Sequence, residues 1–291
     1  MSLGTLPRPD AALSGRAAGG LLELVAGVAP DGRTHLSRRS QRFPLRLTAP
    51  FYLDAAQPGM AYLYVQNPTG GLFEDDDHAL TLDAEPGALV HLTTQAATKV
   101  YRAGLGCARQ RVSLRVAGGA FVEYVPDPLI PHAGARLRQE LVADVQPGGR
   151  LIASETVAPG RVARGEAFEY SSLSLTTRIR SGGEELAVDA VVLEPGVSDP
   201  RHAGVLGDRA YLASLFAVAP EADPEALAAA VIEATDGLPG CLVATGTLPA
   251  GAGVLTRVLA GSGIAAGRAL AAAWSAARVA LLGTPPPRTR K

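Results

Sequence analysis

The stretch VSLRVAGGAFVEYVPDP, residues 112–128, contains the pattern that decides the fold of this chain. Val112, Leu114 and Val116 alternate with polar residues, so one face of the segment is apolar and the other polar, as in a half-buried β-strand. Two glycines then supply a turn, and a second apolar run ends at Pro126. The stretch therefore predicts two short strands that are joined by a tight turn.

The same unit recurs along most of the chain. Apolar runs of about five to eight residues alternate with turn signals made of glycine, proline, asparagine and aspartate. Strands are predicted at residues 21–29, 33–47, 61–65, 80–84, 89–102, 112–116, 120–125, 141–145, 151–157, 173–179 and 186–193. Regular spacing of this kind predicts an all-β sandwich, a barrel or a helix-like coil of strands, and the fold class is therefore mainly β.

Two segments near the C-terminus depart from this pattern and predict α-helices. An alanine-rich stretch begins at Asp223-Pro224 and closes at Gly237, which places an N-cap, a first-turn proline and a terminal glycine in the order that a helix needs. Ser262 similarly precedes an apolar segment at 264–282. We expect one β-rich domain over residues 20–283, preceded by a flexible segment, 1–19, and followed by a tail, 284–291.

Composition excludes several classes of protein. Among 291 residues, 27 are basic and 28 acidic, and this net charge of −1 argues against a nucleic-acid partner. Two cysteines, Cys107 and Cys241, are too few for a zinc quartet or a disulfide framework. No apolar run approaches the roughly 18 residues of a membrane span, and the N-terminus has no signal-peptide core. We expect a soluble cytoplasmic protein without a membrane partner.

The sequence contains no recognisable catalytic motif. It has neither a phosphate-binding loop nor a nucleophile elbow. The one chemically unusual segment is acidic, and its candidate metal ligands are Asp75, Asp76, Asp77 and His78. Carboxylates and an imidazole could hold a divalent cation, and the imidazole favours a transition metal. The alternative is a solvated loop whose charges stay in water.

Several phrases, taken together and in this order, resemble the urease accessory protein D family, which is called H in some bacteria. They are NPTGG (67–71), LTTQAATKVYR (92–102), FVEYVPDPLIP (121–131), GARLRQELVADV (134–145), LIASETVAPGR (151–161), GEAFEY (165–170), and a late Trp274 followed by Arg278. The family usually has a second Gly-Gly-Asp after the first glycine pair. Here Phe73–His78 occupies that place, with two extra residues, so Asp75, Asp76 or Asp77 corresponds to the family aspartate.

The resemblance implies a fold and a role. The fold is a long coiled arrangement of β-strands with a pair of helices. The role is that of a non-catalytic scaffold, or chaperone, that binds the urease apoprotein and accessory proteins F and G, one of them a GTPase. The scaffold helps to deliver nickel to the urease active site. It implies no tightly bound cofactor, only nickel in transit.

The resemblance also implies roles for individual residues. We expect the family-motif residues to be structural or to line the nickel passage: Asn67, Gly70, Gly71, Thr93, Thr94, Gln95, Lys99, Tyr101 and Arg102. The acidic segment is the main candidate for a transient contact with nickel. Glu140 and Glu166 are more distant candidates, which we expect inside the coil of strands.

Two other classes of function compete with the scaffold. The first is a metal-dependent hydrolase on a β-sandwich, with the acidic segment as its metal site. The second is a small-ligand binding module, which predicts one deep apolar pocket. A hydrolase turns over its substrate alone, whereas a scaffold is inert without urease.

Overall fold

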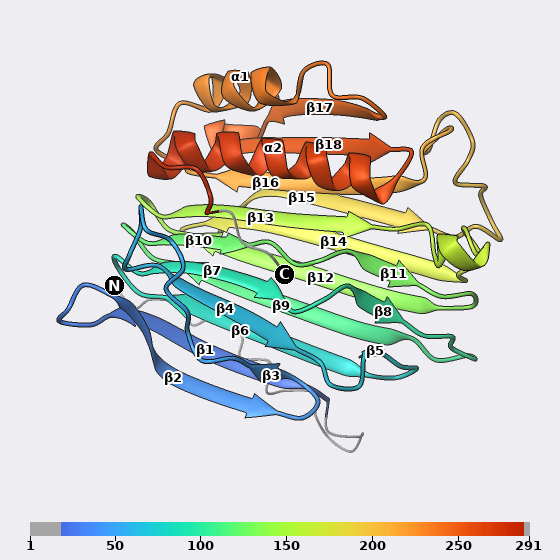
Figure 1. Cartoon of the computed structure of the whole chain (residues 1–291), viewed down its shortest axis with the longest axis horizontal. Coiled ribbons are helices and arrows are strands. Elements are labelled where there is room, and N and C mark those ends of the chain that lie inside the picture. Colours follow the sequence, from blue (N-terminus) through green and yellow to red (C-terminus); the bar gives the residue numbers. More distant parts are fainter. Residues whose placement is uncertain (1–18, 288–291) are drawn as a thin grey trace.

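The structure is a computed structural model, and it describes residues 19–287. The expected flexible segment and part of the expected tail fall on residues 1–18 and 288–291, which lie outside the described residues. The described chain forms two β-sheets that face each other, with two α-helices on the outside of one of them (Figure 1). This confirms the prediction of a mainly β fold with two helices near the C-terminus.

The smaller sheet has seven strands in the order β15-β14-β12-β9-β6-β1-β2. Its strands are β1 (Leu21–Val28), β2 (Thr34–Arg42), β6 (Asp77–Ala84), β9 (Ala108–Val116), β12 (Arg136–Val145), β14 (Ser172–Ser181) and β15 (Glu184–Leu193). Hairpins close its two ends, since β1 pairs antiparallel with β2 and β14 with β15. All other neighbours in this sheet are parallel.

The larger sheet has eleven strands and the main order β17-β18-β16-β13-β10-β7-β4-β3. These strands are β3 (Arg46–Leu47), β4 (Ala61–Gln66), β7 (Leu89–Thr94), β10 (Phe121–Tyr124), β13 (Arg150–Val157), β16 (Tyr211–Val218), β17 (Cys241–Thr247) and β18 (Gly253–Ala260). The short strands β5 (Gly71–Leu72), β8 (Thr98–Val100) and β11 (Leu129–Pro131) form a branch off this order. Two 3-10 turns, η2 (Val162–Arg164) and η3 (Pro249–Gly251), are also present in residues 19–287.

Between its end hairpins the chain winds as a coil, because successive long strands belong to alternate sheets. The segment at 112–128 shows how this happens. Gly119, with a φ of +77°, lies in the turn that carries the chain from β9 in one sheet to β10 in the other. The turn therefore connects the two sheets instead of closing a hairpin. Of the three architectures that the spacing left open, the helix-like coil of strands is confirmed.

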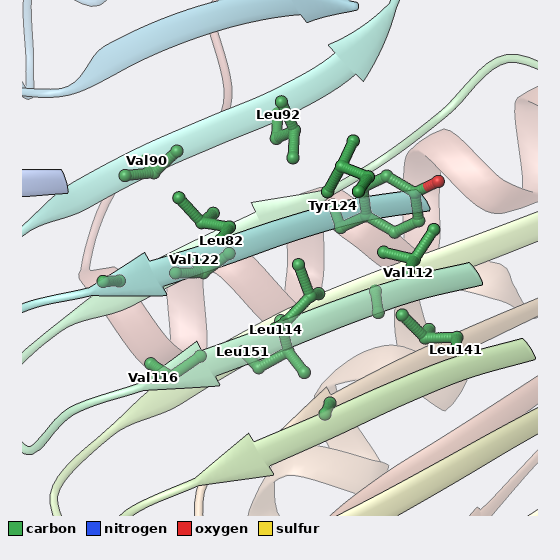
Figure 2. Packing of buried hydrophobic residues seen from close by; sticks show 14 of the residues in the cluster. Leu82, Val90, Leu92, Val112, Leu114, Val116, Val122, Tyr124, Leu141 and Leu151 are labelled. Atoms are coloured by element: carbon green, nitrogen blue, oxygen red, sulfur yellow. The ribbon is translucent and has the colours of Figure 1, made fainter. Parts of the chain in front are cut away.

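The core fills the space between the two sheets. Val112, Leu114 and Val116 of β9 point into it, as their alternation predicts, and meet Val122 and Leu151 from the opposite sheet (Figure 2). Burying apolar surface of this kind is the main driving force for folding. A second apolar cluster lies farther along the same strands and includes Leu137, Val157 and Leu212.

The prediction of a single strand at residues 89–102 is wrong. The segment breaks at Gln95–Ala97, and its two parts join different neighbours. β7 pairs with β4 and β10, whereas β8 pairs with β5 and β11 in the short branch. The N–H of Gln95 still donates to the carbonyl of Val65, and that of Thr98 to Pro128. The change of partner between these two bonds is a tertiary feature that local alternation does not encode.

Both helices begin where the capping residues predict. In α1 (Pro224–Thr235), the carboxylate of Asp223 accepts from the N–H groups of Glu225, at 3.0 Å, and Ala226, at 3.3 Å. In α2 (Gly263–Leu282), the Ser262 hydroxyl accepts from the N–H of Ala265 at 3.2 Å. The two helices pack together over β16, β17 and β18 on the outer face of the larger sheet (Figure 1).

Candidate functional site

The acidic segment forms a tight turn between β5 and β6. Its carboxylates are largely used within the protein: that of Asp76 accepts from the N–H of Phe73 at 2.8 Å, and that of Asp77 lies 3.0 Å from the guanidinium of Arg111. Asp75 has a φ of +63°, a conformation that aspartate tolerates in turns. Within residues 19–287, no group of three or more His, Cys, Asp or Glu side chains is arranged to hold a metal ion.

His78, on β6, points into the space between the sheets, and its Nε2 lies 3.9 Å from the Asp76 carboxylate. Its side chain is 5% exposed, and its Nε2 has no hydrogen-bond partner within the described chain. The ring lines a cavity of about 30 Å³ together with Gln110, whose Oε1 also lacks a partner there. Burial lowers the pKa of His78, although Asp76 and Asp77 oppose this effect. The imidazole is therefore neutral at pH 7, the form that binds metals.

The cavity marks one end of a line of polar side chains between the sheets. On β12, Gln139 lies between Leu137 of one apolar cluster and Leu141 of the other. Ser214 on β16 lies in the same way between Leu212 and Phe216. Residues two apart on a strand share a face, so these polar side chains point into the layer between the sheets.

We call the whole set the polar row. It consists of His78, Gln110, Gln139, Thr177 and Asp189 from the smaller sheet, and Thr94, Tyr124, Glu155, Ser214 and Arg257 from the larger sheet. Buried polar groups are unfavourable unless they find partners. Accordingly, the Arg257 guanidinium donates to the carboxylate of Asp189 at 2.6 Å and to the hydroxyl of Ser214 at 2.7 Å.

Glu155 is the titratable residue at the middle of the polar row. The side-chain amide of Gln139 donates to its carboxylate. Burial is the main cause that raises the pKa of Glu155 to about 7; the nearby carboxylate of Asp189 raises it further, and Gln139 and Arg257 oppose the shift. The carboxyl group therefore exchanges its proton close to neutral pH, whereas an ordinary glutamate is fully ionised there.

The prediction that Glu140 and Glu166 lie inside the coil is wrong. Glu140 follows Gln139 on β12, and the alternation of a strand places it on the outer face, 3.6 Å from the guanidinium of Arg178. Glu166 lies in the loop after η2, where its carboxylate accepts from Nε of Arg161 at 2.7 Å. That hydrogen bond is the main cause of the lowered pKa of Glu166. Neither residue belongs to the polar row.

The NPTGG turn and the TTQAATKVYR segment meet in the short branch. The Asn67 amide donates to the carbonyl of Gly71 at 2.8 Å and shapes the turn, in which Gly70 has a φ of +83°. β5 pairs with β8, with Gly71 opposite Lys99. Gly71 has no room for a side chain, because a Cβ there would lie 2.3 Å from the carbonyl oxygen of Lys99.

The remaining motif residues hold neighbouring segments together. The hydroxyl of Thr93 donates to the carbonyl of Val125 at 2.6 Å, and that of Thr94 accepts from the N–H of Asp127 at 2.8 Å. Tyr101 stacks on Phe73, with ring centroids 4.5 Å apart. Arg102 forms an isolated bridge with Ala135. Of the family-motif residues, only Thr94 lies in the polar row.

A second buried polar group lies beneath α2, on the opposite face of the larger sheet. We call it the α2 anchor. The guanidinium of Arg278, fully buried, donates to the carboxylates of Asp54 and Glu123, the latter at 3.0 Å. Trp274 also donates to Glu123, at 2.8 Å, and His91 lies 2.8 Å from the same carboxylate.

Most of this group was not predicted from the sequence. Arg278 was indicated only by the resemblance, and Asp54, His91 and Glu123 were not predicted. One signal was present: Glu123 interrupts the apolar run FVEYV, and its side chain points to the face opposite the core of Figure 2. Its partner from α2, Arg278, lies 155 positions later in the chain, so the local sequence pattern does not reveal the pair.

No helix in the described part of the chain is long and apolar enough to cross a membrane. A protein-family model described as "UreD urease accessory protein" matches residues 18–291. "Urease accessory protein UreD 2" of Streptomyces griseus is 40% identical over 278 residues, which cover 94% of this chain and 93% of that protein.

Relatives from other lineages cover the chain as fully. "Urease accessory protein UreD" of Mycolicibacterium gilvum is 38% identical, over 90% of this chain and 93% of the relative. The protein of the same name from Haloarcula marismortui is 35% identical, over 97% and 94%. These matches extend across both sheets and both helices, so the chain belongs to the UreD urease accessory protein family.

Proposed function

We propose that this protein is a non-catalytic urease maturation factor that binds the urease apoprotein together with accessory proteins F and G and passes nickel toward the urease active site. Membership of the UreD family supports the role in maturation. The structural observation that carries the nickel step is the polar row, because, apart from the Arg257 guanidinium, its side chains offer oxygen or nitrogen atoms to a cation within an otherwise apolar layer.

The chemistry of the polar row suits a cation that binds only transiently. A tight metal site needs several protein ligands, and no group of three acidic, histidine or cysteine side chains is arranged for one within residues 19–287. The polar row offers instead a neutral imidazole at His78, amide oxygens, and a carboxyl at Glu155 that ionises near pH 7. Imidazole suits nickel, and scattered oxygen ligands bind it weakly.

The test compares two glutamates: Glu155, on β13 of the larger sheet, points into the layer between the sheets, whereas Glu140, on β12 of the smaller sheet, lies on its outer face. Glu155→Gln removes one ionisable carboxyl from the polar row, and Glu140→Gln is the matched control on the outer face. Each variant replaces the natural protein in a strain that lacks the gene, and nickel per urease is measured. We expect nickel content and activity to fall with Glu155→Gln only, while the accessory complex still assembles. Equal nickel content in both strains would contradict the passage.

The hydrolase alternative finds no support in the geometry. Its metal site required the acidic segment, but Asp76 and Asp77 are bound by Phe73 and Arg111. A small-ligand module predicted a deep apolar pocket, and the apolar cavity beside His78 has a volume of only about 30 Å³. The scaffold is therefore the function that the observations favour.

A further inference from the structure

The ends of the two main strand orders differ in how they are protected against pairing with another strand. β2 carries Arg38, Arg39 and Arg42, and its ladder contains a bulge. β3 has only two residues. β15 begins with two glutamates, turns Asp189 inward, and also pairs through an irregular register. Charges, bulges and short length are the devices by which proteins blunt sheet edges.

β17 has none of these devices. Its sequence, CLVATGT, contains no charge and no proline, and it pairs with β18 in an unbroken register over seven residues. No strand pairs with its other side in the described chain. An uncharged, regular edge of this length is a template for another strand.

The backbone groups that face the free side can be identified from the flanking hydrogen bonds. Leu248 donates to Gly253 at 2.8 Å, and Gly261 donates to Gly240 at 3.0 Å. Antiparallel pairing alternates hydrogen-bonded and non-bonded pairs, so the even-numbered residues between them also bond to β18. The N–H and C=O groups that turn away from β18 are those of Cys241, Val243, Thr245 and Thr247.

A cleft of about 230 Å³ runs beside this edge, between β17 and the end of α1. Both Leu242 and Val243 line it. Consecutive residues face opposite sides of a strand, so a cleft lined by both follows the strand's edge. Apolar surface is available there: Ile232 of α1 is 50% exposed and Leu242 is 55% exposed.

We infer that the β17 edge and this cleft bind an extended segment of a partner protein, which adds to the larger sheet as one more strand. A strand laid between a sheet edge and a helix gains backbone hydrogen bonds from the edge and specificity from the side chains that enter the groove. The segment has an apolar side chain for the cleft between Ile232 and Val243.

Charge defines a second requirement for this segment. Asp236 lines the cleft at the C-terminal end of α1, where the helix dipole is also negative. A lysine or arginine in the segment therefore complements this position. A second copy of β17 has no basic residue to offer. On the proposed function, the occupant is a segment of the urease apoprotein or of one of accessory proteins F and G.

The test removes one edge donor without disturbing the bond pattern to β18. Thr245→Pro deletes an N–H that faces the free side, and Thr245→Val keeps that N–H while removing the same hydroxyl. Ile232→Asp, at an exposed position, alters the cleft alone. Purified urease apoprotein, accessory protein F and accessory protein G are each titrated against the natural chain and the three variants.

We expect one of these partners to slow amide hydrogen exchange at residues 241–247. Thr245→Pro and Ile232→Asp should weaken its binding about tenfold, which is the size of one lost hydrogen bond or contact, and Thr245→Val should not. The inference would be overturned if no partner slowed amide hydrogen exchange at residues 241–247. It would also be overturned if Thr245→Pro and Ile232→Asp both bound the partner as tightly as the natural chain. Concentration-dependent dimerisation that Thr245→Pro abolishes would likewise overturn it, because it would identify a second copy as the occupant.

A complementation experiment separates this inference from the proposed function. If the natural chain does not restore nickel to urease in a strain lacking the gene, the proposed function is wrong. If the natural chain and both edge variants restore it equally, only the β17 edge loses its role.

Discussion

At the scale of single residues, the strongest constraints come from charges that are removed from water. The α2 anchor places the Arg278 guanidinium against Asp54 and Glu123, and all three side chains are at most 3% exposed. Removing one member of such a group leaves the others buried without compensation, which is far more destabilising than the loss of an exposed ion pair.

Arg278→Ala is expected to lower the free energy of unfolding by about 3 to 5 kcal/mol, because two buried carboxylates lose their cation. Arg115→Ala is the control, since Arg115 and Asp83 form an exposed pair, 46% and 47% exposed, whose loss amounts to less than about 1 kcal/mol. Urea unfolding followed by circular dichroism measures both values. Similar losses in the two variants would mean that the α2 anchor does not hold the helix.

Glu155 makes stability depend on pH in a defined direction. Its pKa is raised to about 7 in the folded chain from an ordinary value of 4.5, so the native state holds this proton more tightly than the unfolded state. The contribution is fully present below pH 4.5 and is lost as the pH rises toward 7. Glu155→Gln does not titrate, so its stability relative to the natural chain should increase over this range.

The measurement is the difference in unfolding free energy between Glu155→Gln and the natural chain, at half-unit steps of pH. Glu140→Gln provides the baseline, because Glu140 is on the outer face. A difference that stays flat across the interval would show that the Glu155 carboxyl is not desolvated in solution.

At the scale of elements, the local sequence determines where strands, turns and helices begin. The arrangement of the strands depends instead on contacts between residues that are far apart in the sequence. The alternation at Val112, Leu114 and Val116 and the caps at Asp223 and Ser262 were sufficient to predict their elements. The break at Gln95–Ala97 was not predictable, because it depends on which strand lies beside each half of the segment.

The candidate site was predicted only in part. His78 was chosen for its chemistry, and the structure places it in the polar row. Glu140 was expected inside the coil but lies outside, because it alternates with Leu137 and Leu141, which face the core. Glu155 lies in a segment that was predicted as a strand without a site residue, and nothing in the sequence indicated that Asp189, from another strand, approaches it.

The pairing of β5 with β8 explains the second glycine of NPTGG and gives a prediction for this element. Gly71→Ala places a methyl group 2.3 Å from the Lys99 carbonyl oxygen, so it should force the strands apart and destabilise the fold by about 1 to 3 kcal/mol. Gly246→Ala is the matched control in a strand, since a Cβ there meets nothing within 4 Å. Thermal unfolding that is equally unaffected in both variants would disprove this account.

At the scale of the whole molecule, the two sheets act as walls and the polar row as a line between them. The smaller sheet turns its outer face to solvent, whereas α1 and α2 cover part of the larger one (Figure 1). The polar row, the β17 edge and the α2 anchor are therefore three separate features, on the inside, at one edge and under the helices.

The isolated protein is expected to hydrolyse neither urea nor GTP. The sequence has no phosphate-binding loop, and the described residues contain no three-ligand metal group. Steady-state assays with each substrate, with and without added nickel, check this expectation. In the corresponding deletion strain, urease protein should be present but poor in nickel. A fully metallated urease in that strain would refute the maturation role.

The coil also fixes how the length of the polar row can change. Each winding contributes one strand to each sheet, and neighbouring strands lie about 4.8 Å apart. Inserting one winding would move the two ends of the row apart by about that distance, while side chains away from the insertion kept their neighbours. The number of windings therefore sets the length of the polar row in discrete steps. A substitution within one winding changes the chemistry of the row but not its length.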